Sequence, residues 1–291
     1  MICLVTGGLG FVGSNLVDEL VNLGHEVHVW DNLCSESSST TYRRDDVKYT
    51  ISDVREINNP EFAGSHSRYD VIFHLAAFAR IQPSFEDPLG YLSNDIMGTA
   101  AVCELARRLG SKVVYAGSSS AYGGPMLNPY AFAKFTGEQV CEMYHKVYGM
   151  STVTARFFNV YGPRQPKTGT WATVIGVFEN LTKEGKPLTV TGDGEQRRDF
   201  THISDIVRGF IALSKIEGQG QVLNLGTGTN YSINEVARMF GDQVQYIPKR
   251  PGEAWITLAD ISETKKLTGW SPNIHLPGYV LQWKMHNLKT D

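Results

Sequence analysis

The chain opens with a short apolar run, Ile2-Cys-Leu-Val-Thr6, followed by a glycine-rich turn, Gly7-Gly-Leu-Gly-Phe-Val-Gly13. The apolar run has the composition of a buried strand, and residues 11–23 after the turn have helical spacing. Only glycine lets a backbone turn this tightly between a strand and a helix and lie close to a phosphate. A helix that begins here also directs unpaired N–H groups toward an anion. This pattern predicts a dinucleotide-binding turn formed by Gly7, Gly10, Phe11, Val12 and Gly13.

A carboxylate follows the second expected strand, residues 26–30. Asp31 comes 18 residues after Gly13, and Asn32 is next to it. A carboxylate at this point accepts hydrogen bonds from the adenosine ribose hydroxyls of a dinucleotide. It would repel the 2′-phosphate of NADP, and no arginine follows directly to neutralise that group. We therefore expect NAD as the cofactor.

Strands and helices alternate through the first half of the chain. Consecutive apolar residues, typical of strands covered on both faces, occur at 2–6, 26–30, 47–51, 71–75, 112–117 and 152–158. Helical spacing occurs between them at 11–23 and 91–109. Strand–helix alternation with short connections predicts an α/β fold with a Rossmann-type, doubly wound parallel sheet.

The pattern changes after Tyr161, where glycines and prolines cluster up to Gly169. Helical segments then follow at 172–184, 204–215 and 232–240, with one strand at 222–225. We expect residues 1–160 to form the dinucleotide-binding domain. Residues 161–291 would form a smaller, mixed α/β substrate domain, with some segments crossing back to the sheet.

Composition excludes several classes of protein. Of the 291 residues, 42% are hydrophobic and 20% charged, which argues against disorder, and the net charge of −3 without a basic run argues against nucleic-acid binding. No apolar stretch is long enough to span a membrane, and no signal peptide is recognisable. The four cysteines and eight histidines show no metal-ligand spacing. We therefore expect a cytoplasmic protein with no metal, membrane or nucleic-acid partner.

Tyr130 and Lys134 lie four residues apart on an expected helix after Pro129, so their side chains project from one face. A tyrosine with its ordinary pKa near 10 acts as a base at neutral pH only when its phenolate is stabilised. A nearby ammonium and the positive charge of an oxidised nicotinamide both provide that stabilisation. Upstream, the serine-rich loop 117–120 follows a buried strand, where a hydroxyl can reach the same substrate oxygen.

In this order, these segments resemble the extended short-chain dehydrogenase/reductase family, and within it the nucleotide-sugar 4-epimerases of the UDP-glucose (galactose) type. The resemblance covers essentially the whole chain. The matching segments are 6–13, 31–32, 53–55, 74–77, Asn94 with 98–99, 117–123, Tyr130 with Lys134, 156–159, 192–200 and 250–253.

The resemblance implies a role for each matching position. On the cofactor side, Asp53 and Val54 would lie at the adenine, Asn94 near a ribose, and Leu75, Ala76 and Ala77 along the cofactor. Tyr130 would be the base, and Lys134 would hold the nicotinamide ribose and lower the pKa of Tyr130. The sugar hydroxyl would bind Ser118, or Ser119 if the alignment slips by one residue. The nucleotide diphosphate would bind Asn159, Arg198 and Arg250, because guanidinium groups suit phosphate oxygens.

The implied reaction is NAD-dependent epimerisation at C4 of UDP-glucose and UDP-galactose, or of the N-acetylhexosamine pair, through a 4-keto intermediate. Related 4,6-dehydratases carry Asp-Glu, and related decarboxylases carry Glu, just after the catalytic hydroxyl. This chain has Ser119 and Ser120 there, so proton removal at C5 lacks an obvious base, which favours an epimerase over a dehydratase. The 4,6-dehydratase and decarboxylase reactions stay as alternatives, and a third alternative is a non-catalytic NAD-binding protein.

Three further expectations concern the sugar pocket, His74 and the assembly of the protein. A small residue shortly after Arg250-Pro-Gly-Glu253 would admit 2-acetamido sugars, and Thr257 occupies that position unless the neighbouring Trp255 does. His74 is expected to pack beneath the cofactor. The family also implies a homodimer through the helices around 98–109 and 130–148.

Overall fold

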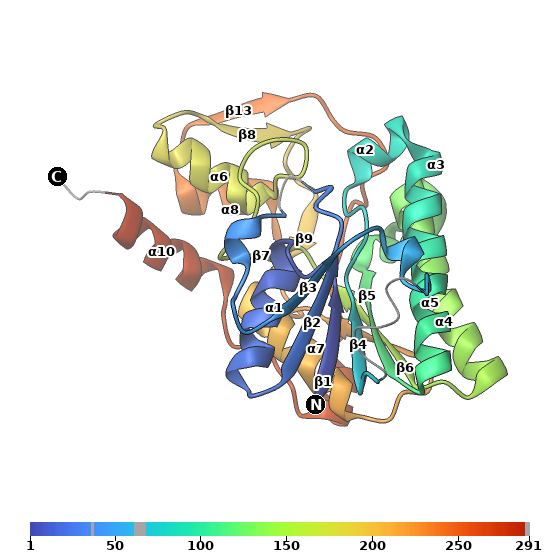
Figure 1. Cartoon of the computed structure of the whole chain (residues 1–291). Coiled ribbons are helices and arrows are strands. Elements are labelled where there is room, and N and C mark those ends of the chain that lie inside the picture. Colours follow the sequence, from blue (N-terminus) through green and yellow to red (C-terminus); the bar gives the residue numbers. More distant parts are fainter. Residues whose placement is uncertain (36–37, 61–67, 289–291) are drawn as a thin grey trace.

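The computed structural model describes residues 1–35, 38–60 and 68–288. A seven-stranded sheet in the order β11-β6-β5-β4-β1-β2-β3 lies at its centre (Figure 1). All neighbouring strands are parallel. The strands are β1 (Ile2–Thr6), β2 (Glu26–Asp31), β3 (Lys48–Ile51), β4 (Val71–His74), β5 (Lys112–Ser118), β6 (Thr152–Phe157) and β11 (Gln221–Leu225). This order is that of a Rossmann sheet extended by one strand, which confirms the predicted fold class.

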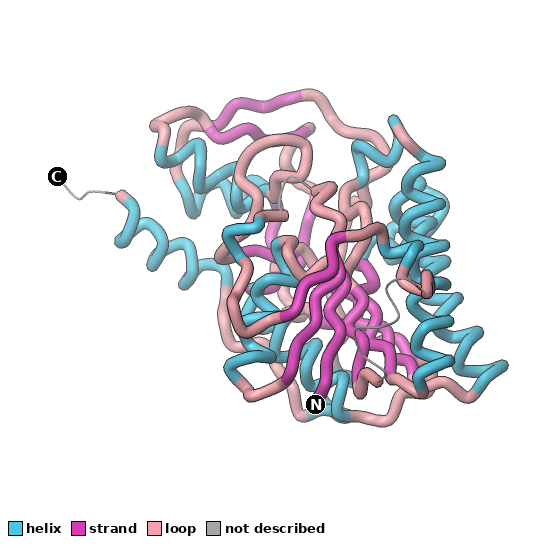
Figure 2. The backbone as a smooth tube through the Cα atoms, viewed as in Figure 1, coloured by secondary structure: helices cyan, strands magenta, loops and turns pink. Residues whose placement is uncertain are grey.

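Helices cover both faces of the sheet (Figure 2). α1 (Phe11–Asn22) and α7 (Ile203–Lys215) pack on one face, and α4 (Gly98–Leu109) and α5 (Pro129–Tyr148) pack on the other. Successive strand residues point to opposite faces, so β1 contributes Val5 to the first of these cores and Leu4 to the second. This double burial explains the consecutive apolar residues of the strands.

A smaller unit lies beyond the carboxyl ends of the strands, at the top and left of Figure 1. It contains α6 (Val174–Lys183), α8 (Ile233–Phe240) and α10 (Leu276–Asn287), which share a separate core that includes Phe178 and Phe240. Three strand pairs complete it: β8 (Leu188–Thr191) with β13 (Val244–Ile247), β9 (Arg197–Asp199) with β12 (Asn230–Ser232), and β7 (Val160–Tyr161) with β10 (Thr201–His202).

The two halves of the sequence are interleaved in space. β11 and α7 come from the second half, yet β11 pairs with β6 and α7 packs on the main sheet. The division of the chain at residue 160 stays a prediction. Short elements complete the fold: η1 (Thr40–Tyr42), η2 (Val54–Glu56), α2 (Ile81–Glu86), η4 (Ser119–Gly123), η5 (Pro125–Leu127) and α9 (Ser262–Thr268).

The segment predicted as one helix over 91–109 is divided in the structure. It consists of α3 (Pro88–Tyr91), the π-helical η3 (Leu92–Met97) and α4. A π-helical turn widens the helix and is frequent at functional sites. Here it carries two buried polar residues, Asn94 and Asp95, beside the carboxyl edge of the sheet.

Candidate active site

A cavity of about 840 Å³ lies between the carboxyl edge of the sheet and the smaller unit. It brings together nearly all of the predicted site residues: Gly7, Gly10, Phe11, Val12, Gly13, Asp31, Asn32, Val54, Leu75, Ala76, Ala77, Asn94, Ser118, Ser119, Tyr130, Lys134, Asn159, Arg198 and Arg250. Asp53 is the exception. Its carboxylate forms an ion pair of 2.7 Å with Arg55, and its side chain does not line the cavity.

The glycine turn needs its glycines for steric reasons. A Cβ on Gly7 would lie 2.8 Å from the backbone nitrogen of Ala76, and a Cβ on Gly13 would lie 2.0 Å from the carbonyl oxygen of Gly7. Gly7 also has a φ of 71°. No side chain caps the start of α1, so the N–H groups of its first turn are free for an anion at the cavity wall. These features fit the pyrophosphate of a dinucleotide.

Asp31 lies at the end of β2 and is buried. Its carboxylate accepts hydrogen bonds from the backbone nitrogens of Leu9 (2.9 Å) and Leu33 (2.8 Å). Burial raises the pKa of Asp31, and these two bonds oppose the rise. Each oxygen keeps a lone pair for a ribose hydroxyl.

The arginines that follow β2 are occupied elsewhere. The guanidinium of Arg43 lies over the Tyr49 ring, and Arg44 pairs with Asp18 and Asp46. Neither is placed to neutralise a 2′-phosphate at Asp31, so the site fits NAD better than NADP.

Tyr130 is held at the start of α5. The Asn128 side chain caps this helix by accepting a hydrogen bond of 2.7 Å from the backbone nitrogen of Ala131, and Pro129 occupies the first turn. The Tyr130 hydroxyl donates a hydrogen bond of 3.1 Å to Ser118 Oγ. The structure therefore pairs Tyr130 with Ser118, the last residue of β5, and not with Ser119.

Lys134 is buried one helical turn beyond Tyr130. Its Nζ donates a hydrogen bond of 2.7 Å to the carbonyl oxygen of Ala116. Burial lowers the pKa of Lys134, while the charges of Asp95 and Glu138 raise it. This places the ammonium at the cavity wall, beside the residues predicted to hold the cofactor.

Opposing effects act on the Tyr130 hydroxyl. Burial raises the pKa of Tyr130, while the hydrogen bond to Ser118 and the positive charge of Arg80 lower it. Sequence reasoning assigned this lowering to Lys134. That role of Lys134 stays a prediction, and Arg80 is a further cation that lowers the pKa of Tyr130.

The residues predicted to bind the nucleotide diphosphate line the cavity from segments of the smaller unit. Asn159 has a φ of 28°, unusual for a residue with a side chain, and its Nδ2 donates a hydrogen bond of 2.9 Å to the carbonyl oxygen of Asp199. Arg198 donates to the carbonyl oxygens of Arg197 and Trp255 and lies 3.5 Å from a Glu253 oxygen.

The structure distinguishes the two candidates for the position that would control sugar size. Thr257 is 4% exposed and lines the cavity. Trp255 is 50% exposed and lies outside the lining, with Lys249 over its ring. Thr257 is therefore the residue whose size affects the cavity.

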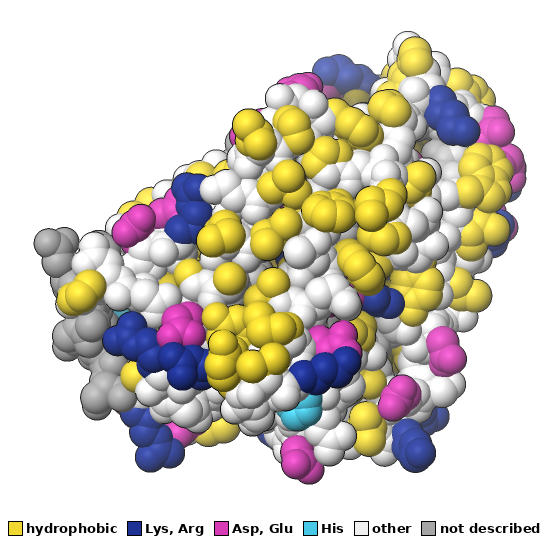
Figure 3. All heavy atoms as spheres, turned by 90° about the vertical axis from the view of Figure 1, so that its right-hand side faces the viewer, with side chains coloured by type: hydrophobic (Ala, Val, Ile, Leu, Met, Phe, Trp, Pro, Cys, Tyr) yellow, Lys and Arg dark blue, Asp and Glu magenta, His cyan; other side chains and the backbone are white. Residues whose placement is uncertain are grey.

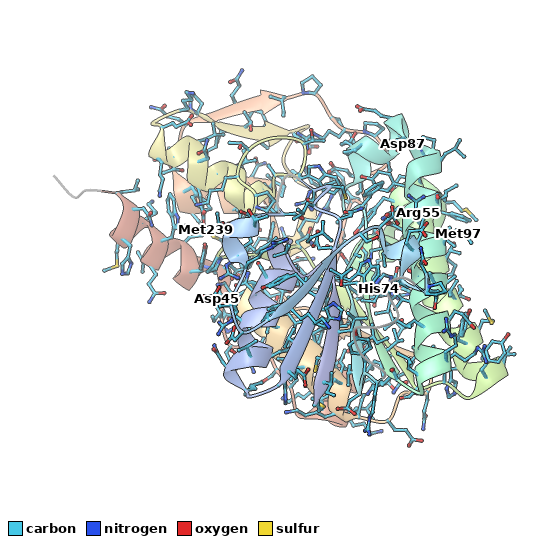
Figure 4. All side chains as sticks on the ribbon, viewed as in Figure 1. Asp45, Arg55, His74, Asp87, Met97 and Met239 are labelled. Atoms are coloured by element: carbon cyan, nitrogen blue, oxygen red, sulfur yellow. The ribbon has the colours of Figure 1, made fainter. Side chains whose placement is uncertain are left out.

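His74 lies among the strands (Figure 4), and both of its ring nitrogens have hydrogen-bond partners. One ring nitrogen contacts Thr6 Oγ1 at 2.7 Å, and the other contacts Thr99 Oγ1 at 3.0 Å. Burial lowers the pKa of His74 to about 3, so the ring is neutral. It ties β1 and β4 to α4 below the cavity. No group of residues that could hold a metal occurs in the described part of the chain.

Sequence reasoning missed two charged residues near the reacting groups. Arg80 follows β4 at the carboxyl edge of the sheet and lines the cavity, and this position after a buried strand was the available signal. Asp95 lies on η3, where its Oδ1 accepts a hydrogen bond of 2.8 Å from the Phe78 nitrogen, and burial raises the pKa of Asp95 to about 6. Helical spacing alone gives no sign of the π-helical turn that carries Asp95.

Known proteins resemble this chain over nearly its full length. The chain is 30% identical over 311 residues to a putative UDP-glucose 4-epimerase of Methanocaldococcus jannaschii, covering 99% of each chain. It is 32% identical over 298 residues to UDP-glucuronic acid decarboxylase 1 of Xenopus tropicalis, covering 94% of this chain and 69% of the relative.

Solved structures agree with this relationship. The UDP-glucose 4-epimerase of Thermotoga maritima, solved with UDP-glucose, superimposes with a TM-score of 0.92 at 27% identity, covering 99% of this chain and 100% of the other. The UDP-glucuronic acid 4-epimerase of Bacillus cereus, solved with UDP-glucuronic acid and NAD, gives a TM-score of 0.87 at 30% identity, covering 97% of each chain.

The family model of the NAD-dependent epimerases and dehydratases matches residues 3–226. This range contains the glycine turn, Asp31, Ser118, Tyr130 and Lys134. The cofactor of the protein is accordingly NAD, and the protein is an enzyme. The chain belongs to the NAD-dependent epimerase/dehydratase family.

Proposed function

We propose that the enzyme inverts the configuration at C4 of a nucleotide-linked hexose. The observation that carries this proposal is the hydrogen bond of 3.1 Å between Tyr130 and Ser118 inside the cavity, between the dinucleotide turn and Arg198. NAD, which the glycine turn, Asp31 and Lys134 would hold, would supply the hydride acceptor and donor that inversion at C4 requires.

The chain's own residues handle the proton. The Tyr130 phenolate removes the proton from the C4 hydroxyl as a 4-keto sugar forms, and it returns that proton when the new alcohol forms. Ser118 Oγ, which already faces Tyr130, hydrogen-bonds the same sugar oxygen and fixes its position. Lys134 holds the nicotinamide ribose from the same helix.

A second group of residues retains the intermediate. Arg198, Arg250 and Asn159 line the far end of the cavity and bind the nucleotide diphosphate. With the nucleotide anchored there, the keto sugar turns within a cavity of about 840 Å³ and presents its other face. Binding energy from the nucleotide thus retains the intermediate between the two half-reactions.

Elimination of water and loss of carbon dioxide are the competing reactions. Removal of the C5 proton needs a base near Ser118, and the next two residues of this chain are Ser119 and Ser120. Among the described residues that line the cavity, the carboxylates are Asp31 and Glu253, which lie at the adenosine end and beside Arg198. This distribution favours epimerisation over 4,6-dehydration, and product analysis separates epimerisation from decarboxylation.

Product analysis tests the proposal. NAD-loaded enzyme is incubated with UDP-glucose, UDP-N-acetylglucosamine, UDP-glucuronate and the corresponding GDP and dTDP sugars, and the products are identified by NMR. We expect C4 inversion of a UDP-linked sugar, and Tyr130→Phe should lower turnover by about 100-fold or more while NAD stays bound. Loss of water or carbon dioxide without C4 inversion would contradict epimerisation, and a lack of any turnover would favour a non-catalytic NAD-binding role.

We also propose that the protein is a homodimer. The face that carries α3, α4 and α5 shows many apolar side chains (Figure 3). Exposed apolar residues of α3, η3 and α5 are Leu89, Met97, Met143, Val147 and Tyr148. Sedimentation should give twice the monomer mass, and Met143→Glu with Val147→Glu should give the monomer.

The described helices are all too short or too polar to span a membrane, and no disulfide joins the four cysteines in the described residues. The free thiols support the proposed cytoplasmic location.

A further inference from the structure

Arg80 provides a positive charge inside the cavity that the reaction at C4 does not account for. It is half-buried, caps the start of α2 through its backbone, and lines the cavity together with Tyr130 and Ser118. None of the described ion pairs involves Arg80. Its described partners are backbone carbonyl oxygens: those of Trp171, which accepts from Nε at 2.7 Å and also from Nη2, and of Ala79, which accepts from Nη1 at 3.0 Å.

Two N–H donors of Arg80 are not used by its described contacts. A guanidinium has five N–H donors, and these contacts occupy three of them. One N–H is left on Nη1 and one on Nη2. Two N–H groups of one guanidinium can bind the two oxygens of a carboxylate.

The environment makes an anionic ligand favourable. Burial lowers the pKa of Arg80 and no carboxylate compensates for it, so the charge is kept in the cavity at a cost in stability. The orientation of the side chain is fixed from both sides, because Trp171 comes from the smaller unit and its ring packs on Phe78 next to β4. A guanidinium that is held in place and has no described carboxylate partner can bind an anionic ligand.

The position of Arg80 indicates which part of the substrate carries that anion. Arg80 directly precedes α2, which packs against α5, the helix that carries Tyr130, and Tyr130 would contact the sugar at C4. The positive charge of Arg80 also lowers the pKa of Tyr130. In a hexopyranose, C5 is bonded to C4 and carries C6, so a substituent at C6 lies next to the reacting hydroxyl. The nucleotide diphosphate, in contrast, is attached at C1 across the ring and would contact Arg198 and Arg250.

We propose that Arg80 binds the C6 carboxylate of a nucleotide-linked hexuronic acid, and that this contact makes uronates the preferred substrates of the enzyme. This inference rests on the proposed C4 chemistry, because that chemistry places the sugar against Tyr130. It adds a substrate-binding residue that discriminates by charge at C6, independently of any selection by Thr257.

Ligand binding to an inactive enzyme tests the inference without depending on turnover. In the NAD-loaded Tyr130→Phe protein, calorimetry should give a Kd for UDP-glucuronate about 30- to 100-fold lower than that for UDP-glucose, as expected for a charge-assisted bidentate pair. Adding Arg80→Met should bring the two values within about threefold of each other. Arg80→Lys should retain only part of the preference, because an ammonium lacks the fork.

A matched control separates this effect from misfolding and from net charge. Arg68→Met removes an exposed arginine that pairs with Asp70 below the sheet, and it should leave the ratio of the two Kd values unchanged. NAD affinity, measured on every variant, reports whether the cavity is intact. Equal Kd values for UDP-glucuronate and UDP-glucose in the protein that retains Arg80 would overturn the inference, as would a preference that survives Arg80→Met.

Product analysis of the wild-type enzyme distinguishes failure of this inference from failure of the proposed function. C4 inversion of UDP-glucose with no preference for UDP-glucuronate would overturn the role of Arg80 and leave epimerisation standing. Release of carbon dioxide from UDP-glucuronate without inversion would overturn epimerisation and still support a carboxylate site at Arg80.

Discussion

The Tyr130 hydroxyl donates its hydrogen bond to Ser118 Oγ, at 3.1 Å, across the gap between α5 and the end of β5. Ser118 also accepts a hydrogen bond of 3.2 Å from the backbone nitrogen of Ser120, which fixes the direction of its hydroxyl. Ser119, the next residue along, begins η4 and makes no described contact with Tyr130. Two adjacent serines with the same burial therefore have different relationships to the reacting group.

This difference predicts unequal effects of two matched substitutions. Ser118→Ala should lower kcat by about 100-fold, because it removes a hydroxyl aimed at the developing charge on the sugar oxygen. Ser119→Ala should lower kcat by less than about fivefold. Steady-state kinetics on both variants, with NAD content measured in parallel, checks the prediction. A larger loss in Ser119→Ala would reverse the assignment of the two hydroxyls.

Asp31 should control the choice between NAD and NADP. Asp31→Ser removes the carboxylate that would repel a 2′-phosphate and bind the ribose hydroxyls. We expect the Kd for NAD to rise by about 10- to 100-fold and the preference for NAD over NADP to fall by at least that factor. Fluorescence titration of the apoenzyme measures both constants. Asp46→Asn removes an exposed carboxylate of the same region and should change neither, and an unaltered preference in Asp31→Ser would contradict this role.

Thr257 should determine whether the sugar can carry a 2-acetamido group. Because Thr257 is buried in the cavity wall, Thr257→Tyr should lower kcat/KM for UDP-N-acetylglucosamine relative to UDP-glucose by about tenfold or more. Trp255→Ala alters a neighbour outside the lining and should leave that ratio within about twofold. Wild-type enzyme that turns over UDP-glucose but not UDP-N-acetylglucosamine in parallel assays would refute the hypothesis.

Asp95 should make the stability of the fold depend on pH. Burial raises the pKa of Asp95 to about 6, above the value near 3.9 expected in the unfolded chain. The folded state therefore binds this proton more tightly. Stability from this group is fully present below pH 4 and is lost as the pH rises through 6.

Asp95→Asn should remove the loss of folding stability that Asp95 causes as the pH rises through 6. The variant should gain about 3 kcal/mol in free energy of unfolding relative to wild type at pH 8, and the gain should shrink toward zero near pH 4. Urea denaturation at both pH values measures the difference. A gain that is the same at both values would show that Asp95 does not titrate in this range.

Much of the fold follows from local sequence. The strands of the main sheet are covered on both faces, so they stand out as consecutive apolar residues, and the glycine turn marks where the first helix begins. The smaller unit is harder to anticipate because β9, β10 and β12 have two or three residues each, too few to show a period. The π-helical η3 was missed because its side-chain pattern is that of an ordinary helix.

Site residues could be predicted where they directly follow a strand, or lie on a helix, that the sequence pattern itself reveals. The turn at Gly7, Asp31 after β2 and Tyr130 on α5 belong to this group. Arg80 and its partner Trp171 do not, because their contact joins positions 91 residues apart through a backbone carbonyl. Nothing in the local pattern of either segment indicates such a pairing.

β11 has a consequence for synthesis of the protein. Paired residues of β6 and β11 are 68 positions apart (Val153 with Gln221), so β6 is synthesised first. Until residues 221–225 follow, β6 is an edge strand with unpaired amide and carbonyl groups. The nascent chain is thus exposed to strand-mediated association during that interval. Release of the C-terminal third closes the border, so truncation before β11 should yield inclusion bodies and not an isolated cofactor-binding fragment.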